Sequence, residues 1–221
     1  MKTKLSPAYL IRNLQMSVAK LCADQLRAIS NNYGVKLKSS HAHELVAAFF
    51  GYKSKAALLA DTLASIENIG QAQTFVLIPS AFIEERRKCL VDLPSDLPDT
   101  YILGEEMFTF LAAQKMLVAN SFPSWIHLSE TLTKEYLQKN GHLILPRNFG
   151  PFEKAHNIFN KPLYEFNPSI ETTDNGVKLT VSNRYYGSSH VNFQPIDVVL
   201  TIKLKRIAGH FGYAKPEISL I

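Results

Sequence analysis

Long hydrophobic runs and cysteine are both scarce in this chain of 221 residues. Apolar runs such as 56–60 and 75–78 fall far short of the ~18 residues that a membrane-spanning helix needs, so we expect no contact with a membrane. The basic first residues lead into an amphipathic pattern rather than the apolar block of a signal peptide. These absences predict a cytoplasmic protein.

The chain also lacks sequence signatures of catalysis. It has no Gly-x-Ser-x-Gly, no phosphate-binding glycine loop and no dinucleotide fingerprint, so we expect no cofactor. Cys22 and Cys89 have no partner spacing for zinc and are expected to be two buried thiols rather than a disulfide. An enzyme with an unrecognised site in the C-terminal region remains an alternative.

Histidine spacing argues against a metal site. His41 and His43 stand two positions apart, which on a helix turns them about 200° from each other. The other five histidines are spread along the chain, at positions 127, 142, 156, 190 and 210. We therefore expect no metal, with His41 helping to cap its helix.

What the chain does have is 46% hydrophobic residues and an uneven charge. Residues 1–70 hold nine Lys and Arg against four Asp and Glu, residues 71–140 six against nine, and residues 141–221 nine against six. Basic ends can attract phosphate backbones or an acidic partner, although lysines scattered over a solvated surface give the same sums.

Three helices are predicted in the first 70 residues. Apolar residues recur at helical spacing over 5–29, and a second helix from Ser39 or Ser40 to Phe50 ends at Gly51. Ser54 can cap a third helix over 55–67. The prediction is a helical module over 1–70 followed by a larger domain over 71–221.

The two helices that meet at Gly51 can be compared with a DNA-binding helix-turn-helix. Ala47, Gly51 and Ala57 fit that pattern loosely. The second helix offers few side chains that could bond base edges, and Lys53 and Lys55 would reach phosphates only. The pattern therefore favours a packed helical hairpin.

The same hairpin resembles a helical module at the N-terminus of some bacterial glyoxalase-related proteins. The matching positions are Ser40, His41, Leu45, Val46, Ala47, Gly51, Tyr52, Ser54 and Leu58, within residues 39–63, about a tenth of the chain. Lys55 and Ala56 stand where that module has an aromatic-rich turn. The resemblance implies a helical hairpin and does not extend to glyoxalase chemistry, which resides in paired βαβββ units.

The C-terminal domain is predicted to be α+β. We expect a strand over 74–79, helices over 80–90, 105–120 and 124–139, and strands over 142–145, 163–166, 177–186, 196–207 and 217–220. Alternating apolar and polar residues in 177–181 and 200–205 indicate an antiparallel sheet with one solvated face, covered on the other by helices. Residues 174–176, Asp-Asn-Gly, predict a tight turn.

Basic and aromatic residues cluster beside two of these strands. Aromatic rings next to guanidinium groups on a sheet can stack unpaired bases while lysines follow the phosphates, although the same residues can protect a sheet edge. With the two hairpin lysines, the candidate binding residues are Lys53, Lys55, Arg184, Tyr185, Tyr186, Lys203, Lys205 and Arg206.

We therefore predict a non-enzymatic binding protein of bacterial type that contacts nucleic acid or an acidic protein through its basic ends. The alternatives are a protein interaction module of a multi-component bacterial system and the enzyme mentioned above. The sequence does not indicate an oligomeric state.

Overall fold

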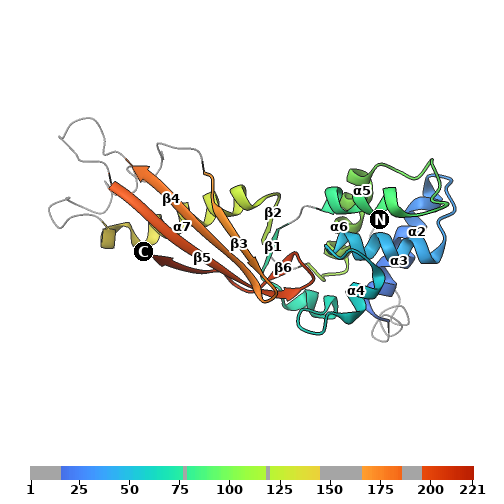
Figure 1. Cartoon of the computed structure of the whole chain (residues 1–221), viewed down its shortest axis with the longest axis horizontal. Coiled ribbons are helices and arrows are strands. Elements are labelled where there is room, and N and C mark those ends of the chain that lie inside the picture. The colour runs from blue at the N-terminus through green and yellow to red at the C-terminus, as the bar shows by residue number, and fades with distance from the viewer. Residues whose placement is uncertain (1–15, 77–78, 118–119, 145–165, 186–195) are drawn as a thin grey trace, which may run out of the picture. The chain divides into compact units, whose positions relative to one another are not determined.

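The protein is an α+β protein, as the sequence predicts. The computed structural model describes residues 16–76, 79–117, 120–144, 166–185 and 196–221 (Figure 1). None of the helices in these ranges is long and apolar enough to cross a membrane.

The chain forms two compact units. Unit 1 comprises residues 1–73, 78–119 and 207–212, and unit 2 comprises residues 74–77, 120–206 and 213–221. This division differs from the predicted boundary at residue 70, because two helices beyond that boundary pack with the N-terminal helices and a short C-terminal segment returns to them.

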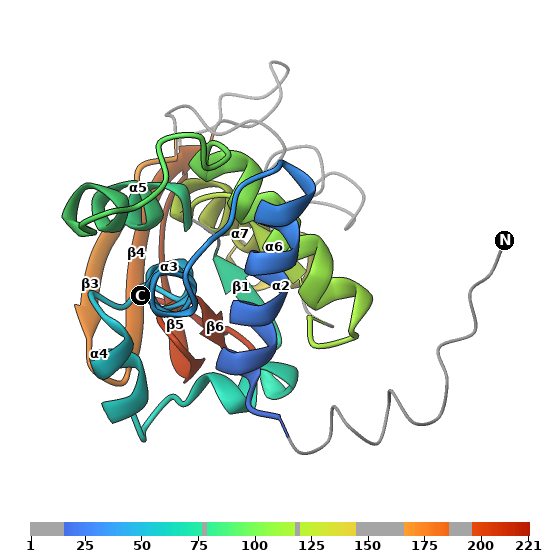
Figure 2. The ribbon, with the colours of Figure 1, turned by 90° about the vertical axis from the view of Figure 1, so that its right-hand side faces the viewer.

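Unit 1 is built around helix α3, Ser39–Phe49. Figure 2 shows α3 between α2, Val18–Asn32, and α5, Pro79–Cys89, and both helices contact it. Helix α6, Thr100–Ala113, contacts α2 and α5. The helices share an apolar core to which each contributes buried side chains, among them Leu26, Leu45, Val46, Phe49, Ile83, Leu103 and Met107.

Helix α2 begins at Val18, so the predicted single helix over 5–29 is wrong across residues 16 and 17. Ser17 has an extended backbone and its hydroxyl accepts the Lys20 N–H. Both carboxylate oxygens of Glu67 accept the Val18 N–H at 3.0 Å. A carboxylate there satisfies a free helix N–H and suits the positive end of the dipole.

The third predicted helix is much shorter than expected. Helix α4 spans only Lys55–Ala60, and a 3₁₀ helix, η1, follows at Ile66–Gln71. The Asp61 carboxylate ends α4 by accepting the N–H groups of Leu63 at 3.1 Å and Ala64 at 3.0 Å. Aspartate competes with helix formation in this way because its side chain bonds nearby backbone groups.

Unit 2 is organised by a mixed sheet. The strand order is β2, Asn120–Phe122; β1, Thr74–Val76; β6, Gly212–Tyr213; β5, Ile196–Ala208; β4, Gly176–Tyr185; β3, Ser169–Thr173. Strand β7, Glu217–Leu220, also pairs with β5. The pairs β4–β5 and β5–β7 are antiparallel as predicted. Strand β3, which the sequence does not predict, also pairs antiparallel with β4, whereas β1 and β2 are parallel.

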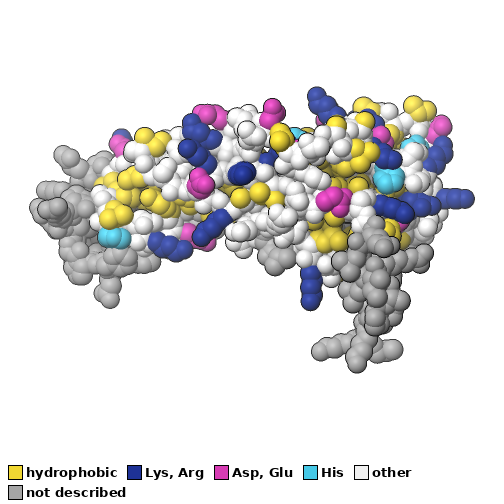
Figure 3. All heavy atoms as spheres, turned by 90° about the horizontal axis from the view of Figure 1, so that it is seen from below, with side chains coloured by type: hydrophobic (Ala, Val, Ile, Leu, Met, Phe, Trp, Pro, Cys, Tyr) yellow, Lys and Arg dark blue, Asp and Glu magenta, His cyan; other side chains and the backbone are white. Residues whose placement is uncertain are grey.

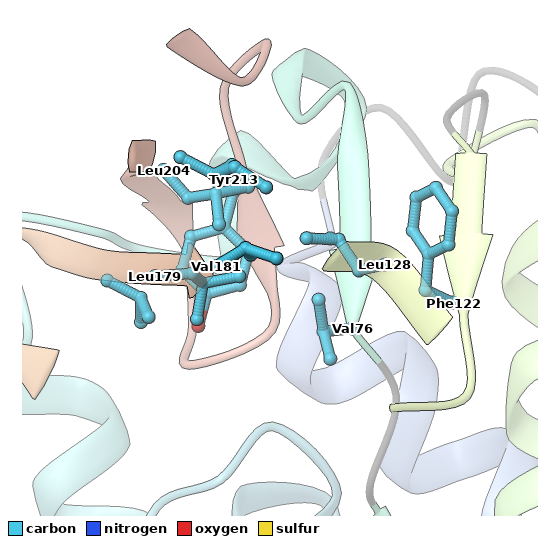
Figure 4. Close-up of a cluster of buried hydrophobic side chains, with 9 residues drawn as sticks. Val76, Phe122, Leu128, Leu179, Val181, Leu204 and Tyr213 are labelled. Atoms are coloured by element: carbon cyan, nitrogen blue, oxygen red, sulfur yellow. The ribbon is translucent and has the colours of Figure 1, made fainter. Parts of the chain in front are cut away.

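One face of this sheet is buried against helix α7, Trp125–Ile144. The buried face is apolar except for Asn183, and it is formed by the odd-numbered residues of β4 from Val177 to Tyr185 and the even-numbered residues of β5 from Val198 to Leu204. Figure 4 shows part of the resulting cluster, in which Leu128 of α7 joins side chains of β1, β2 and β4. The turn predicted at 174–176 joins β3 to β4.

Several predicted boundaries are wrong. Helix α7 continues through Asn140 and Gly141, so residues 142–144 are helical and not a strand. Helix α6 begins at Thr100, capped by Asp99, and ends before Lys115, whose φ is +57°. Phe166 lies outside any strand, and the rest of the strand predicted at 163–166 falls outside the described residues.

Candidate partner-binding surface

Helix α4 and the residues just after it expose apolar side chains in unit 1. Leu59 is 64% exposed and Leu63 71% exposed, and Ala56 and Ala60 are exposed as well. Ala56, Leu59 and Ala60 share one side of the helix because they are three and four positions apart. We use the name α4 surface for six exposed residues: Ala56, Leu59, Ala60, Leu63, Lys53 and Lys55.

Contacts at both ends hold this short helix in place. The Ser54 hydroxyl accepts the Ala57 N–H at 3.2 Å, and Glu44 of α3 accepts the Lys55 N–H at 3.1 Å. Leu58 is the one buried side chain of α4. A six-residue helix is not stable alone in water, so these contacts are what keeps the α4 surface ordered.

Glu44 connects three helices. Besides the N-terminus of α4 it binds the Arg86 guanidinium of α5 at 2.7 Å, and both side chains are about three-quarters buried. An ion pair with this degree of burial and a second hydrogen bond to the same carboxylate fixes geometry more than an exposed pair does.

The turn between α3 and α4 ends α3 in a left-handed glycine. Gly51 has φ +84°, its N–H donates to Ala48 O, and the Tyr52 N–H donates to Ala47 O, both at 2.9 Å. This pair of bonds is a Schellman motif. The Tyr52 hydroxyl then donates to Asp61 at 2.7 Å, so the two ends of the α4 segment are tied together.

A segment from the far end of the chain also holds the turn. The His210 N–H donates to Phe50 O at 3.0 Å, and the Gly209 N–H donates to Ala64 O at 2.8 Å. The rings of Tyr52 and His210 lie 4.8 Å apart. Sequence reasoning missed this contact, because nothing local in residues 207–212 indicates which turn they meet.

The electrostatic environment of the α4 surface is cationic at its N-terminal side. Burial first, and then the positive charge of Lys55, lowers the pKa of His43. Lys20 acts in the same direction, while Asp24 and Glu44 oppose it. Within the described ranges, neither Lys53 nor Lys55 forms an ion pair.

Tyr185 is not available to stack a base. Its side chain is 1% exposed, in an apolar cluster with Leu137, Val198 and Leu200, and burial raises its pKa to about 12. Tyr186 lies outside the described residues.

Arg184 is neutralised by its cross-strand neighbour. Its guanidinium binds the Asp197 carboxylate through two hydrogen bonds, at 2.5 and 2.7 Å. The hydrogen bond and charge of Arg184 lower the pKa of Asp197. In the β4–β5 register this pair is eight positions from the Gly176–Lys205 pair, or about 27 Å along the strands, so Arg184 does not join the lysines.

Two neighbouring lysines of the sheet are flanked by acids. Lys203 stands in a cross-strand row of four residues, Glu171, Lys178, Lys203 and Glu217. Lys178 binds Glu171 at 3.1 Å. Lys203 and Lys205 are exposed and Arg206 is half-buried. Figure 3 likewise shows Lys and Arg interspersed with Asp, Glu and uncharged side chains on the face that it draws. Those candidate residues of unit 2 that the structure describes therefore do not form one cationic and aromatic surface.

A hollow in unit 2 lies beside charged side chains. A hollow of about 290 Å³ lies at the Arg184–Asp197 pair, bordered by Ser182, Asn183, Val198 and Val199. Among the described residues no three His, Cys, Asp or Glu side chains are placed to share a metal ion. His41 is buried and His43 half-buried on α3.

The two cysteines differ from each other. Cys22 is buried, and burial followed by the nearby charge of Glu67 raises its pKa to about 12. Cys89 is exposed, so the prediction of two buried thiols is wrong for this residue, which lies at the last position of α5.

No known protein family, curated protein or solved structure matches this chain.

Proposed function

We propose that the chain is a non-catalytic binding protein whose α4 surface docks an acidic, apolar segment of a partner protein. The observation that carries the proposal is a short ordered segment, helix α4 and the residues just after it, which exposes Leu59 and Leu63 beside two lysines without ion pairs among the described residues. Contiguous apolar side chains bordered by charge are typical of protein docking sites.

The apolar side chains supply the affinity. Removing a leucine of this exposure from water contributes about 1–2 kcal/mol. Because Glu44, Ser54 and Asp61 already order the segment, little conformational entropy is lost on docking.

The lysines determine which apolar segments fit. Lys53 and Lys55 lie at the start of α4, so a partner with carboxylates beside its apolar side chains gains charge complementarity there. A protein partner fits the α4 surface better than nucleic acid does, because nothing aromatic is exposed within it to stack a base.

The test is binding of a fluorescent amphipathic peptide with leucine at helical spacing and glutamate between, measured by anisotropy. The comparison ligands are the same peptide with lysine for glutamate, a single-stranded DNA and phosphatidylserine vesicles. We expect the glutamate peptide to bind and the lysine peptide to bind at least tenfold more weakly. Preferential binding of DNA or vesicles would contradict the proposal.

The variant that removes the site is Leu59→Ser with Leu63→Ser. We expect it to lose the glutamate peptide and to keep its thermal stability, because both side chains are already largely in water. The matched control is Val91→Ser, which removes another side chain of unit 1 that is 79% exposed. Equal binding by the leucine variant and the wild type would refute the proposal, as would equal loss in the control.

A further inference from the structure

Strand β7 is a border of the sheet in unit 2. It pairs with β5 on one side, in the register Leu200–Leu220 to Lys203–Glu217, and pairs with no other strand among the described residues. Figure 1 shows it along the lower border of the sheet. Leu220 is 43% exposed and Ile221 76% exposed, and Figure 3, drawn from below, shows hydrophobic side chains gathered in this part of unit 2.

A hydrogen bond at the end of β7 determines which of its backbone groups point away from β5. The Ile221 N–H donates to Val199 O at 2.9 Å, which makes Val199 and Ile221 a hydrogen-bonded pair. Such pairs alternate along an antiparallel ladder, so Ser219 also bonds to β5. The N–H and C=O groups of Ile218 and Leu220 consequently point away from β5.

We propose that this border pairs with the same border of a second copy of the chain. The two β7 strands would run antiparallel about a two-fold axis at Ser219. Ile218 of one copy then faces Leu220 of the other, and each pair exchanges both of its N–H···O bonds. The two sheets become one continuous sheet, as in pairing by strand addition.

The side chains of β7 favour a second copy in this register. On the apolar face Ile218 and Leu220 meet each other, which covers the exposed part of Leu220. On the other face Ser219 meets Ser219 of the second copy, and Glu217 meets Ile221, so no like charges are opposed.

The other border does not have this self-complementarity. Glu171 is the middle residue of β3, so the equivalent two-fold pairing would place two carboxylates opposite each other. Pro168, just before β3, supplies no N–H for a shifted register. A charge at the middle of a border strand is a common way of preventing edge pairing, and β7 has the uncharged Ser219 at the proposed axis. Pro216 stands just before β7 as Pro168 does before β3, so proline does not distinguish the two borders.

The first test introduces charges at residue 219, on the proposed two-fold axis, and measures dimerisation by sedimentation velocity. The protein concentration runs from about 5 to about 500 µM, because a short strand pair makes a small, weak interface. We expect the wild type to dimerise in this range. Ser219→Lys and Ser219→Asp should each raise the dissociation constant at least tenfold, and an equimolar mixture of the two should restore the dimer. Ser169→Lys, an exposed serine on β3, is the matched control and should dimerise like the wild type.

The second test is a disulfide across the axis, in a Cys89→Ser background that removes the exposed thiol. Directly opposite residues of a non-hydrogen-bonded pair have Cα atoms about 4.5 Å apart, within the range of a disulfide. On air oxidation Ser219→Cys should form a covalent dimer, and Ser169→Cys should not. A wild type that stays monomeric throughout, a dimer unaffected by the lysine at 219, or equal cross-linking at both positions would overturn the proposal.

Discussion

Replacing Gly51 by alanine tests how the helical hairpin is held. Gly51 has φ +84°, and a Cβ at this position would lie 2.7 Å from the Cβ of His210. The left-handed conformation costs an alanine about 1–2 kcal/mol, and forcing an extra carbon into a filled space costs about 1–3 kcal/mol. Because the Cβ of His210 is fixed to the backbone and cannot rotate away, we expect a loss of about 3 kcal/mol in the free energy of unfolding.

Two other glycines separate these contributions. Gly34 has φ +76° with nothing within 4 Å of a new Cβ, and Gly70 has neither a left-handed backbone nor a neighbour within 4 Å. We expect Gly34→Ala to cost about 1 kcal/mol and Gly70→Ala less than about 0.5 kcal/mol. Urea unfolding followed by far-ultraviolet circular dichroism measures all three. Equal losses at Gly34 and Gly51 would show that the 209–211 segment does not lie against the turn.

Two further predictions concern buried titrating groups. Because Cys89 is exposed and Cys22 is buried with its pKa raised to about 12, a thiol reagent at pH 8 should label one cysteine rapidly and the second only on unfolding, and Cys89→Ser should abolish the rapid phase. Burial raises the pKa of Tyr185 from 10 to about 12, so its neutral form stabilises the fold fully below pH 10 and this contribution is lost as the pH rises from 10 to 12. Tyr185→Phe should therefore reduce the loss of stability between pH 9 and pH 11, measured by urea unfolding. The exposed Tyr101→Phe should leave it unchanged.

Local patterns predict the long strands well because one face of each is buried. Strand β4 was expected over 177–186 and spans 176–185, and β5 was expected over 196–207 and spans 196–208. Strand β3 carries no such alternation, since all five of its residues are exposed, and it was not predicted. Asn140 and Gly141 are a strong local signal for a helix end, yet Gly141 is buried within α7, so packing overrides the signal.

The candidate site was predictable in part. The exposure of Lys53 and Lys55 follows from their place beside a cap residue. Tyr185 could have been assigned to the core from the sequence, because it has the same odd-numbered phase as Val177 and Leu179. The exposure of Leu59 and Leu63 could not be predicted from the sequence. Both residues fit the apolar side of a helix over 55–67, and only the structure shows that Asp61 ends this helix.

The hairpin motif predicts how the two helices pack and does not indicate which partner the chain binds. Of the positions that match the glyoxalase-related module, Leu45, Val46 and Leu58 are buried and Gly51 and Ser54 shape the turn and the cap. None of the residues of the α4 surface is among these matching positions. A resemblance carried by buried and turn residues therefore supports the hairpin fold alone, and two chains that share it can expose entirely different side chains on α4. For this reason the leucine variant of the α4 surface, rather than variants of the motif, is the informative one for function.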